Sequence, residues 1–276
     1  MGIRYASAAY RELGGMLRRV REKTGLSEGG LARKMGWPLT KISRMENGRR
    51  TSSTTDVIQY VVMCGMTLRE AQPLLELTRQ AERKQGYYLS DRRIGGSLQS
   101  LIFHESSAEH SVIYEPQVIH GLLQTPNYAR ALITAVKPNI DESRVDGAVR
   151  TRMERRRILY LPTTPAFTFY IHEQALRLRI GTEKIMQEQL LHLVLTAALD
   201  NVTLRIVPSV IGERSALGGA FHLMEFHEHR TIVYLENLCD GGLILEDPEF
   251  VQSYHEVVPM LADTALGEGQ SRMCAP

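Results

Sequence analysis

The chain has 276 residues, of which 43% are hydrophobic and 23% are charged, and its formal net charge is +2. These values are typical of a globular protein, and the length favours two domains. Its apolar runs are too short for a membrane-spanning helix, so we expect no membrane association.

The N-terminal segment MGIRYASAAYREL has no apolar stretch followed by a small-residue cleavage site, so we expect no secretory signal. The chain has three cysteines, Cys64, Cys239 and Cys274, far apart in the sequence. An odd number of scattered cysteines suits a reducing cytoplasm better than a disulfide framework. We therefore expect a cytoplasmic protein.

Charge is unevenly divided along the chain. Residues 1–95 contain 18 Lys and Arg against 9 Asp and Glu, whereas the remaining residues contain 15 against 22. A basic N-terminal part on an acidic body suggests a polyanionic partner for the N-terminal part. A merely basic surface would give the same count, so charge alone leaves both interpretations open.

The first expected helix carries apolar residues at i, i+3, i+4 and i+7, namely Leu13, Met16, Leu17 and Val20. Gly25 ends this helix. Ser27 can cap a second helix. Gly36 ends that second helix, because glycine allows the chain to turn tightly.

The third expected helix opens at Pro38 or Thr40 and stops at Asn47-Gly48, a good left-handed end. Counted from Glu28, positions 5, 9, 15 and 18 are Ala32, Gly36, Ile42 and Met45. This is the helix-turn-helix spacing, in which the small residue allows close approach, the glycine turns the chain and the last two are buried. The outer face of the third helix is then free to enter a DNA major groove.

The outward-facing side chains of the third helix are the candidate DNA-binding residues. Those expected to meet base edges are Thr40, Lys41, Arg44 and, as a weaker candidate, Ser43. Those past the helix end are better placed for phosphates: Asn47, Arg49 and Arg50. Leu39 can make only apolar contact, for example with a thymine methyl. A helical bundle without a nucleic-acid role is the alternative, but it does not account for this polar face.

Residues 12–84 resemble the lambda-repressor-like, or xenobiotic-response-element, helix-turn-helix family. The resemblance implies an all-α domain of five helices over residues 1–84, the fourth helix at about 54–64. The fifth follows the capping-box sequence Thr67-x-x-Glu70. It is expected to bend or restart at Pro73 and to run to about Arg83.

Two departures from that family pattern affect the second and third helices. The family often has Gln where Glu28 and Leu39 stand, and Glu28 would repel phosphate. Gly29 and Gly30 each cost about 1 kcal/mol relative to Ala inside a helix. We therefore expect the second helix to be loose until DNA or a partner orders it.

The stretch RKQGYYLSDRRIGGS is polar and contains glycine, and we expect a linker at residues 85–97. Beyond it, residues 98–276 are expected to form an α+β domain with an antiparallel or mixed sheet. The first expected helix of this domain ends at about Glu109. Further helices are expected at about 126–135, 142–160, 183–199 and 248–266. The expected strands are 111–114, 166–171, 201–207, 220–226 and 231–237.

The segments GLLQTPNYARAL, FYIHEQALR, GGAFHLMEF and IVYLEN resemble a domain of unknown function common in actinobacterial regulators, over residues 97–274. His120 stands where that domain usually has proline. The resemblance implies a sensing, dimerising or partner-binding body. It also implies a small-molecule effector or a small protein encoded nearby as partner.

Three enzyme-like patterns have plainer interpretations. GLSEG fits a nucleophile elbow, but a charged helix precedes Ser27 and that residue already caps a helix. YIHEQAL lacks the second His of a zinc motif, because Leu176 occupies that position, so His172 is expected to be structural. The basic run RTRMERRRIL is expected to form salt bridges or a solvated face.

The segment FHLMEFHEHR gathers His222, Glu225, His227, Glu228 and His229. A metal site is conceivable there, but a solvated hairpin tip between two strands is the better interpretation. No Gly-rich phosphate loop is present. We expect no catalytic residue, no metal and no cofactor.

The sequence thus favours a sequence-specific DNA-binding transcriptional regulator, not an enzyme, that acts as a homodimer on double-stranded DNA. Its expected location is the cytoplasm, associated with the nucleoid. An alternative is an interaction protein, such as the antitoxin-like partner of a small neighbouring protein, whose DNA binding is autoregulatory. An enzyme with a basic tether is a third, weaker hypothesis.

Overall fold

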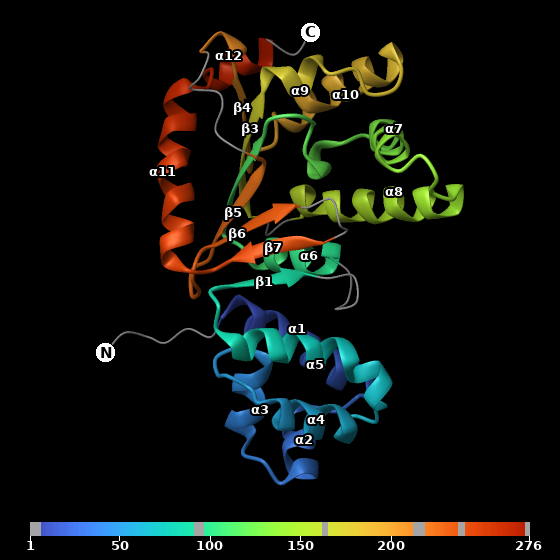
Figure 1. The fold of residues 1–276 in the computed structure, drawn as a ribbon, viewed down its shortest axis with the longest axis vertical. Coiled ribbons are helices and arrows are strands. Elements are labelled where there is room, and N and C mark those ends of the chain that lie inside the picture. The colour runs from blue at the N-terminus through green and yellow to red at the C-terminus, as the bar shows by residue number, and fades with distance from the viewer. Residues whose placement is uncertain (1–6, 91–96, 162–164, 212–218, 237–240, 274–276) are drawn as a thin grey trace. The chain divides into compact units, whose positions relative to one another are not determined.

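The computed structural model describes residues 7–90, 97–161, 165–211, 219–236 and 241–273 (Figure 1). A helical N-terminal region is followed by a region of mixed helices and strands, and the described strands form a seven-stranded mixed sheet. The expected α+β class is confirmed. In the described part of the chain, no helix combines the length and apolar character that a membrane span requires.

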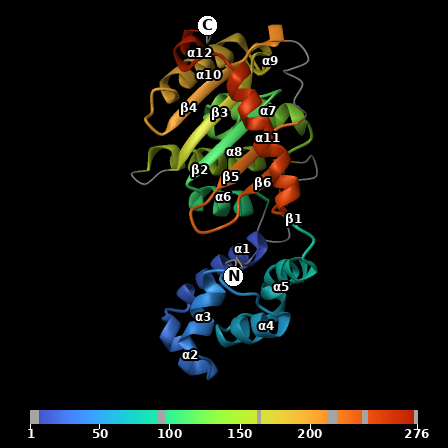
Figure 2. The same ribbon diagram turned by 90° about the vertical axis from the view of Figure 1, so that its left-hand side faces the viewer.

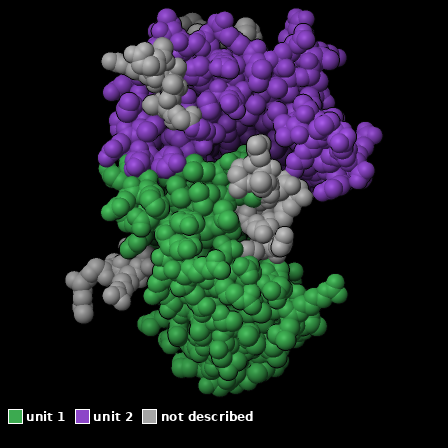
Figure 3. All heavy atoms as spheres, in the orientation of Figure 1, with its two compact units in different colours: residues 1–105, 225–252 green, residues 106–224, 253–276 purple. Residues whose placement is uncertain are grey.

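The chain divides into two compact units, coloured separately in Figure 3. Unit 1 comprises residues 1–105 and 225–252, and unit 2 comprises residues 106–224 and 253–276. Unit 1 thus joins the N-terminal helices to residues 225–252, which lie much later in the chain.

Unit 1 begins with five helices and continues with three strands and most of a sixth helix. The helices are α1 (Ala8–Lys23), α2 (Glu28–Met35), α3 (Leu39–Glu46), α4 (Thr54–Met63), α5 (Leu68–Arg83) and α6 (Ser97–Ser107). The strands are β1 (Tyr87–Ser90), β6 (Ile232–Glu236) and β7 (Gly242–Leu245). β7 lies between the other two and pairs antiparallel with both.

The helix ends in unit 1 follow from local residue chemistry. The Ser27 hydroxyl accepts a hydrogen bond from the Gly30 amide at 3.0 Å and caps α2. Gly36 ends α2 with a φ of 65°, a left-handed conformation that glycine adopts at little cost. Thr67 and Glu70 form the expected capping box at the start of α5. These predictions are confirmed.

Of the bend or restart expected at Pro73, the restart does not occur, because α5 runs from Leu68 to Arg83 as one helix. Leu74 and Leu77 are buried beside the proline. Tertiary packing of this apolar face holds the helix together despite the hydrogen bond that a proline removes.

The segment expected to be a linker contains strand β1. Tyr87–Ser90 pairs with Leu245–Gly242 of β7, and Tyr88 is buried. Strand β7 was not expected either. Residues 91–96 of the expected linker lie outside the described residues.

Unit 2 contains four strands and the helices around them. The strands are β2 (His110–Glu115), β3 (Ala166–His172), β4 (Val202–Val207) and β5 (Phe221–Glu225), of which β2, β3 and β4 are parallel neighbours. The helices are η1 (Gly121–Leu123), α7 (Pro126–Val136), α8 (Glu142–Arg156), η2 (Arg157–Tyr160), α9 (Glu173–Arg177), α10 (Glu183–Thr196), α12 (Glu268–Met273) and most of α11 (Pro248–Thr264).

The parallel strands of unit 2 are covered on both faces, α7 to α10 lying on one side and α11 on the other (Figures 1 and 2). Ile113, Phe169 and Leu204 are paired across the three strands and belong to one buried core. On α11, Tyr254 packs against Phe221 of β5 with ring centroids 5.2 Å apart. Burial on both faces explains why consecutive residues are buried in β2 and β3, whereas β4 alternates over its first four residues.

Cys64 is a buried free thiol at the end of α4. Burial raises the pKa of this thiol. Cys239 and Cys274 lie outside the described residues.

Glycine 14 provides a test of how closely α1 and α3 approach. A Cβ built on Gly14 would lie 2.5 Å from the Met45 carbonyl oxygen, whereas one built on Gly29 of α2 would meet nothing within 4 Å. We expect Gly14→Ala to lower the free energy of unfolding by about 1–3 kcal/mol through overpacking. Gly29→Ala should instead raise it by up to about 1 kcal/mol, because alanine favours helix. Urea denaturation measures both, and equal effects would contradict the close approach.

Candidate nucleic-acid interface

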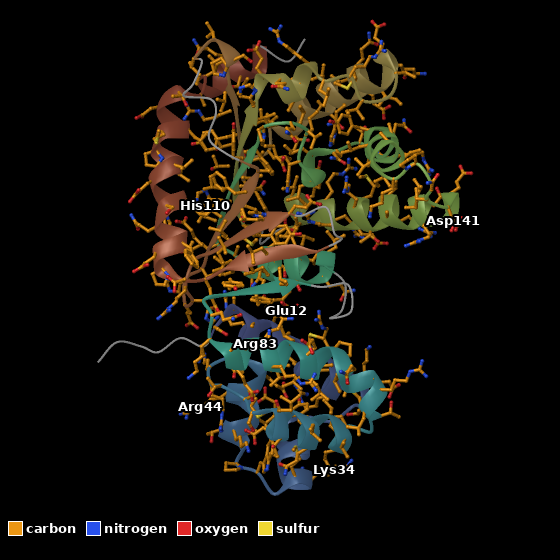
Figure 4. The ribbon with its side chains drawn as sticks, in the orientation of Figure 1. Glu12, Lys34, Arg44, Arg83, His110 and Asp141 are labelled. Carbon is orange, nitrogen blue, oxygen red and sulfur yellow. The ribbon has the colours of Figure 1, made fainter. Side chains whose placement is uncertain are left out.

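Helices α2 and α3 form a helix-turn-helix pair whose inner and outer faces differ sharply. Ile42 and Met45 of α3 are buried, at 0% and 1% exposure. Thr40 and Arg44 are exposed on the outer face of the same helix. Figure 4 labels Arg44 on α3. This is the arrangement that the sequence predicts for a helix whose outer face can meet a duplex.

A buried ion pair holds α3 in place. The Arg21 guanidinium of α1 donates to both carboxylate oxygens of Glu46, at 2.7 and 2.6 Å. The Tyr60 hydroxyl of α4 donates to the same carboxylate at 2.6 Å. Arg21 also donates to the Leu26 carbonyl oxygen, at 2.7 Å, in the turn before α2. One carboxylate at the end of α3 therefore joins three helices.

The electrostatics of this group follow from burial and hydrogen bonding. Hydrogen bonds to the Glu46 carboxylate raise the pKa of Arg21, so the guanidinium stays charged. Burial, and then the hydrogen bond to Glu46, raise the pKa of Tyr60, so its hydroxyl stays a donor. This group of residues was not predicted from the sequence. Glu46 stands four residues after Ile42 on the buried face of α3, and a carboxylate there signals a buried cationic partner.

Lys41 occupies a different environment from the one expected. Its ammonium lies 2.6 Å from a carboxylate oxygen of Asp56, in the first turn of α4, and 3.4 Å from the centroid of the Trp37 ring. Arg50 lies 3.8 Å from the other oxygen of Asp56. Asp56 therefore pairs with two of the cations expected to bind DNA, and Lys41 is directed to Asp56 and Trp37.

The remaining candidate residues lie on one continuous stretch of α3 and the chain after it. Leu39 is 52% exposed. The Asn47 side-chain amide donates to the Ser43 carbonyl oxygen at 2.8 Å, so these two residues serve the helix end. The Arg49 guanidinium lies 2.6 Å from the Glu228 carboxylate. Among the residues that the structure describes, Arg44 has no carboxylate within ion-pair distance.

A second buried polar group in unit 1 lies around Glu12 of α1, which Figure 4 labels. Ser100 donates to one Glu12 oxygen at 2.5 Å, and the Tyr88 hydroxyl lies 2.7 Å both from the other oxygen and from Nε2 of His104. Burial raises the pKa of Glu12 and lowers that of His104. All four residues are at most 3% exposed, so the group ties α1 to β1 and α6.

The zinc-like motif YIHEQAL and the basic run RTRMERRRIL have structural roles in the fold. His172 caps α9 by accepting from the Gln174 amide at 3.1 Å. Arg152 and Arg156, from the basic run, donate to the Gln124 side chain and carbonyl oxygen, at 2.6 and 3.1 Å.

The histidine-rich segment divides between two environments. His222 is buried in β5, with its ring 5.9 Å from that of His120. His227 and Glu228 are exposed in the segment between β5 and β6. The segment therefore does not present these side chains as one exposed cluster.

Comparisons with known protein families agree with the geometry of α2 and α3. Residues 12–74 match the profile described as Helix-turn-helix domain, which supports DNA as a partner. Residues 98–274 match the profile described as Domain of unknown function (DUF5753). No curated protein and no solved structure matched the chain.

The buried ion pair generates a stability prediction. We expect Glu46→Gln to lower the free energy of unfolding by about 3 kcal/mol, because the Arg21 charge is left buried without its counter-charge. The midpoint temperature of thermal unfolding and the affinity for DNA should both fall. Glu76→Gln is the matched control, since Glu76 pairs with Arg79 at the surface of α5 and its loss should barely change the unfolding midpoint. A wild-type midpoint for Glu46→Gln would show that the pair does not hold α3.

Proposed function

Because the chain belongs to the family described as Domain of unknown function (DUF5753) and carries a helix-turn-helix domain before it, we propose that it is a sequence-specific DNA-binding transcriptional regulator. The observation that carries the proposal is the outer face of α3. It presents Leu39, Thr40 and Arg44 on a helix whose opposite face is anchored by Glu46. A rigid helix with one exposed cation suits the reading of base edges in a major groove.

The roles of the exposed residues follow from where each lies. Arg44 is the base-reading cation, and guanine suits it best because a guanidinium can donate two hydrogen bonds to that base edge. Arg49 and Arg50 lie past the end of α3 and would meet phosphates, which orients the domain without reading sequence. Lys41 supports α3 through Asp56 and Trp37 in place of the base contact expected earlier.

The proposal includes a homodimer, because one recognition helix covers only a few base pairs and paired half-sites supply the remaining specificity. The DUF5753 region would receive a signal, either a small molecule or a small protein encoded nearby. Analytical ultracentrifugation with and without a palindromic duplex tests the dimer. A monomer on DNA at all concentrations would reject it.

Removing Arg44 should separate sequence reading from general attraction to DNA. We expect Arg44→Ala to weaken binding to the preferred site by about 1–3 kcal/mol and to relax the preference at one base pair. The control is Arg79→Ala on α5, which removes the same charge from a residue paired with Glu76. Binding selection on randomised duplexes, followed by titration of the selected site, measures both. Equal losses for the two variants would mean that α3 does not read the sequence.

Leu39 gives a second specificity test. If its exposed side chain meets a thymine methyl, replacing that thymine by uracil should weaken wild-type binding at a single position, because uracil lacks only the methyl group. The same replacement should have no effect on Leu39→Ala. Fluorescence titration of the selected duplex with each thymine replaced in turn gives the answer. A profile that is insensitive to every methyl group would remove Leu39 from the interface.

A further inference from the structure

The segment between β5 and β6, residues 226–231, contacts the chain just past the recognition helix. Its Glu228 carboxylate lies 2.6 Å from the Arg49 guanidinium, with both side chains about three-fifths exposed at 61% and 62%. Residues 226–231 and Arg49 belong to the same compact unit. Glu228 thus pairs with Arg49, the cation that the proposed function assigns to a DNA phosphate.

The position of Glu228 is set by an anchor two residues earlier. The Arg11 guanidinium lies 4.2 Å from the centroid of the Phe226 ring, and Arg11 is only 5% exposed. The ring of His229 lies 6.4 Å from that of Phe226, on the other side of Glu228 in the chain. The segment is therefore attached to α1 through Phe226, and His229, on the other side of the acidic residue, packs against the same ring.

The other partner of the ion pair is positioned by the same arginine. Gly48 lies directly against Arg11, since a Cβ built on Gly48 would come within 2.6 Å of the Arg11 Cα. Gly48 precedes Arg49, so the backbone of Arg11 places Arg49 while its guanidinium holds Phe226. Because one buried residue positions the chain on both sides, Arg49 and Glu228 are held close enough to pair.

We propose that Glu228 competes with DNA phosphate for Arg49, so that residues 226–231 restrain DNA binding from within unit 1. A carboxylate and a phosphate offer the same acceptor geometry to a guanidinium, so Arg49 cannot serve both fully. When a duplex binds, Arg49 must be released from Glu228. The Glu228 carboxylate then lies close to the negatively charged DNA backbone. The restraint is modest because the pair is exposed, which suits an adjustable contact.

This inference rests on the proposed function, and it gives the DUF5753 region a route to the DNA-binding surface. Residues 226–231 lie inside the stretch that matches that family, and they continue directly from β5 into β6. Any signal that moves this segment away from Arg49 would strengthen DNA binding. Any signal that holds it there would weaken binding.

The test uses the full chain and a mixed-sequence duplex, because phosphate contacts do not depend on sequence. We expect Glu228→Gln to tighten binding about three- to tenfold at low salt, with the gain shrinking as salt screens both charges. Glu236→Gln on β6 is the control, since it removes the same charge from an exposed strand residue of unit 1. Phe226→Ala should reproduce the gain by releasing the anchor.

A double-mutant comparison identifies the mechanism. In an Arg49→Ala background, Glu228→Gln should have no further effect, because the cation for which both acceptors compete is gone. A gain that persists there would mean that Glu228 repels DNA directly and would overturn the competition. Weaker binding by Glu228→Gln, or a gain equal to that of Glu236→Gln, would also overturn it.

A measurement without DNA separates this inference from the proposed function. The side-chain NMR signal of the Arg49 guanidinium should report restricted rotation in the wild type and free rotation in Glu228→Gln. Free rotation in both would reject the contact whether or not the chain binds DNA. A restrained guanidinium in a protein that ignores every duplex would instead reject the proposed function, and with it the competition.

Discussion

The buried contact between Arg21 and Glu46 is the constraint on which the presentation of α3 depends. The carboxylate has two hydrogen bonds from the guanidinium and one from Tyr60, which satisfies acceptors that would otherwise be costly to bury. A buried pair of this kind adds little net stability compared with an apolar core, but it permits few alternative arrangements. Its consequence is a defined orientation of the last turn of α3 relative to α1 and α4.

That orientation matters because few cations on and just after α3 are without a carboxylate partner among the described residues. Asp56 pairs with Lys41 and approaches Arg50, and Glu228 pairs with Arg49. Two carboxylates thus offset part of the positive charge around α3, and Arg44 stands out among the candidate residues. Local pairing of cations limits non-specific attraction to DNA, which otherwise grows with every uncompensated charge.

Unit 1 is more than a helix-turn-helix domain. Glu12 on α1 is bonded to Ser100 of α6 and Tyr88 of β1, and the amide of Ala8 at the start of α1 donates to Glu246 at 2.5 Å. Arg11, between these two residues, holds Phe226. Three residues of α1, namely Ala8, Arg11 and Glu12, therefore contact β1, α6 and the stretch around β6 and β7. Burial lowers the pKa of the Arg11 guanidinium to about 10, and the neighbouring Tyr88 and Glu246 offset part of that effect. The buried Arg11 guanidinium is held by packing. A shift in the segments around β6 and β7 would therefore change the contacts of α1 directly.

The sequence alone determined the helix-turn-helix domain, because its signals are local. Ser27, Gly36 and the Thr67–Glu70 capping box act through residues within one turn of the chain, and the burial of Ile42 and Met45 follows from helical periodicity. It also predicted the strands of unit 2, which are rich in β-branched and aromatic residues. It missed β1 and β7, because four-residue strands carry little periodicity and exist only through pairing with neighbouring strands. Only the tertiary structure decided that Glu46 meets Arg21, that Lys41 turns to Asp56 and that Glu228 reaches Arg49, 179 residues away. Such contacts depend on where distant backbone segments come together, and residue type and spacing carry no record of that distance.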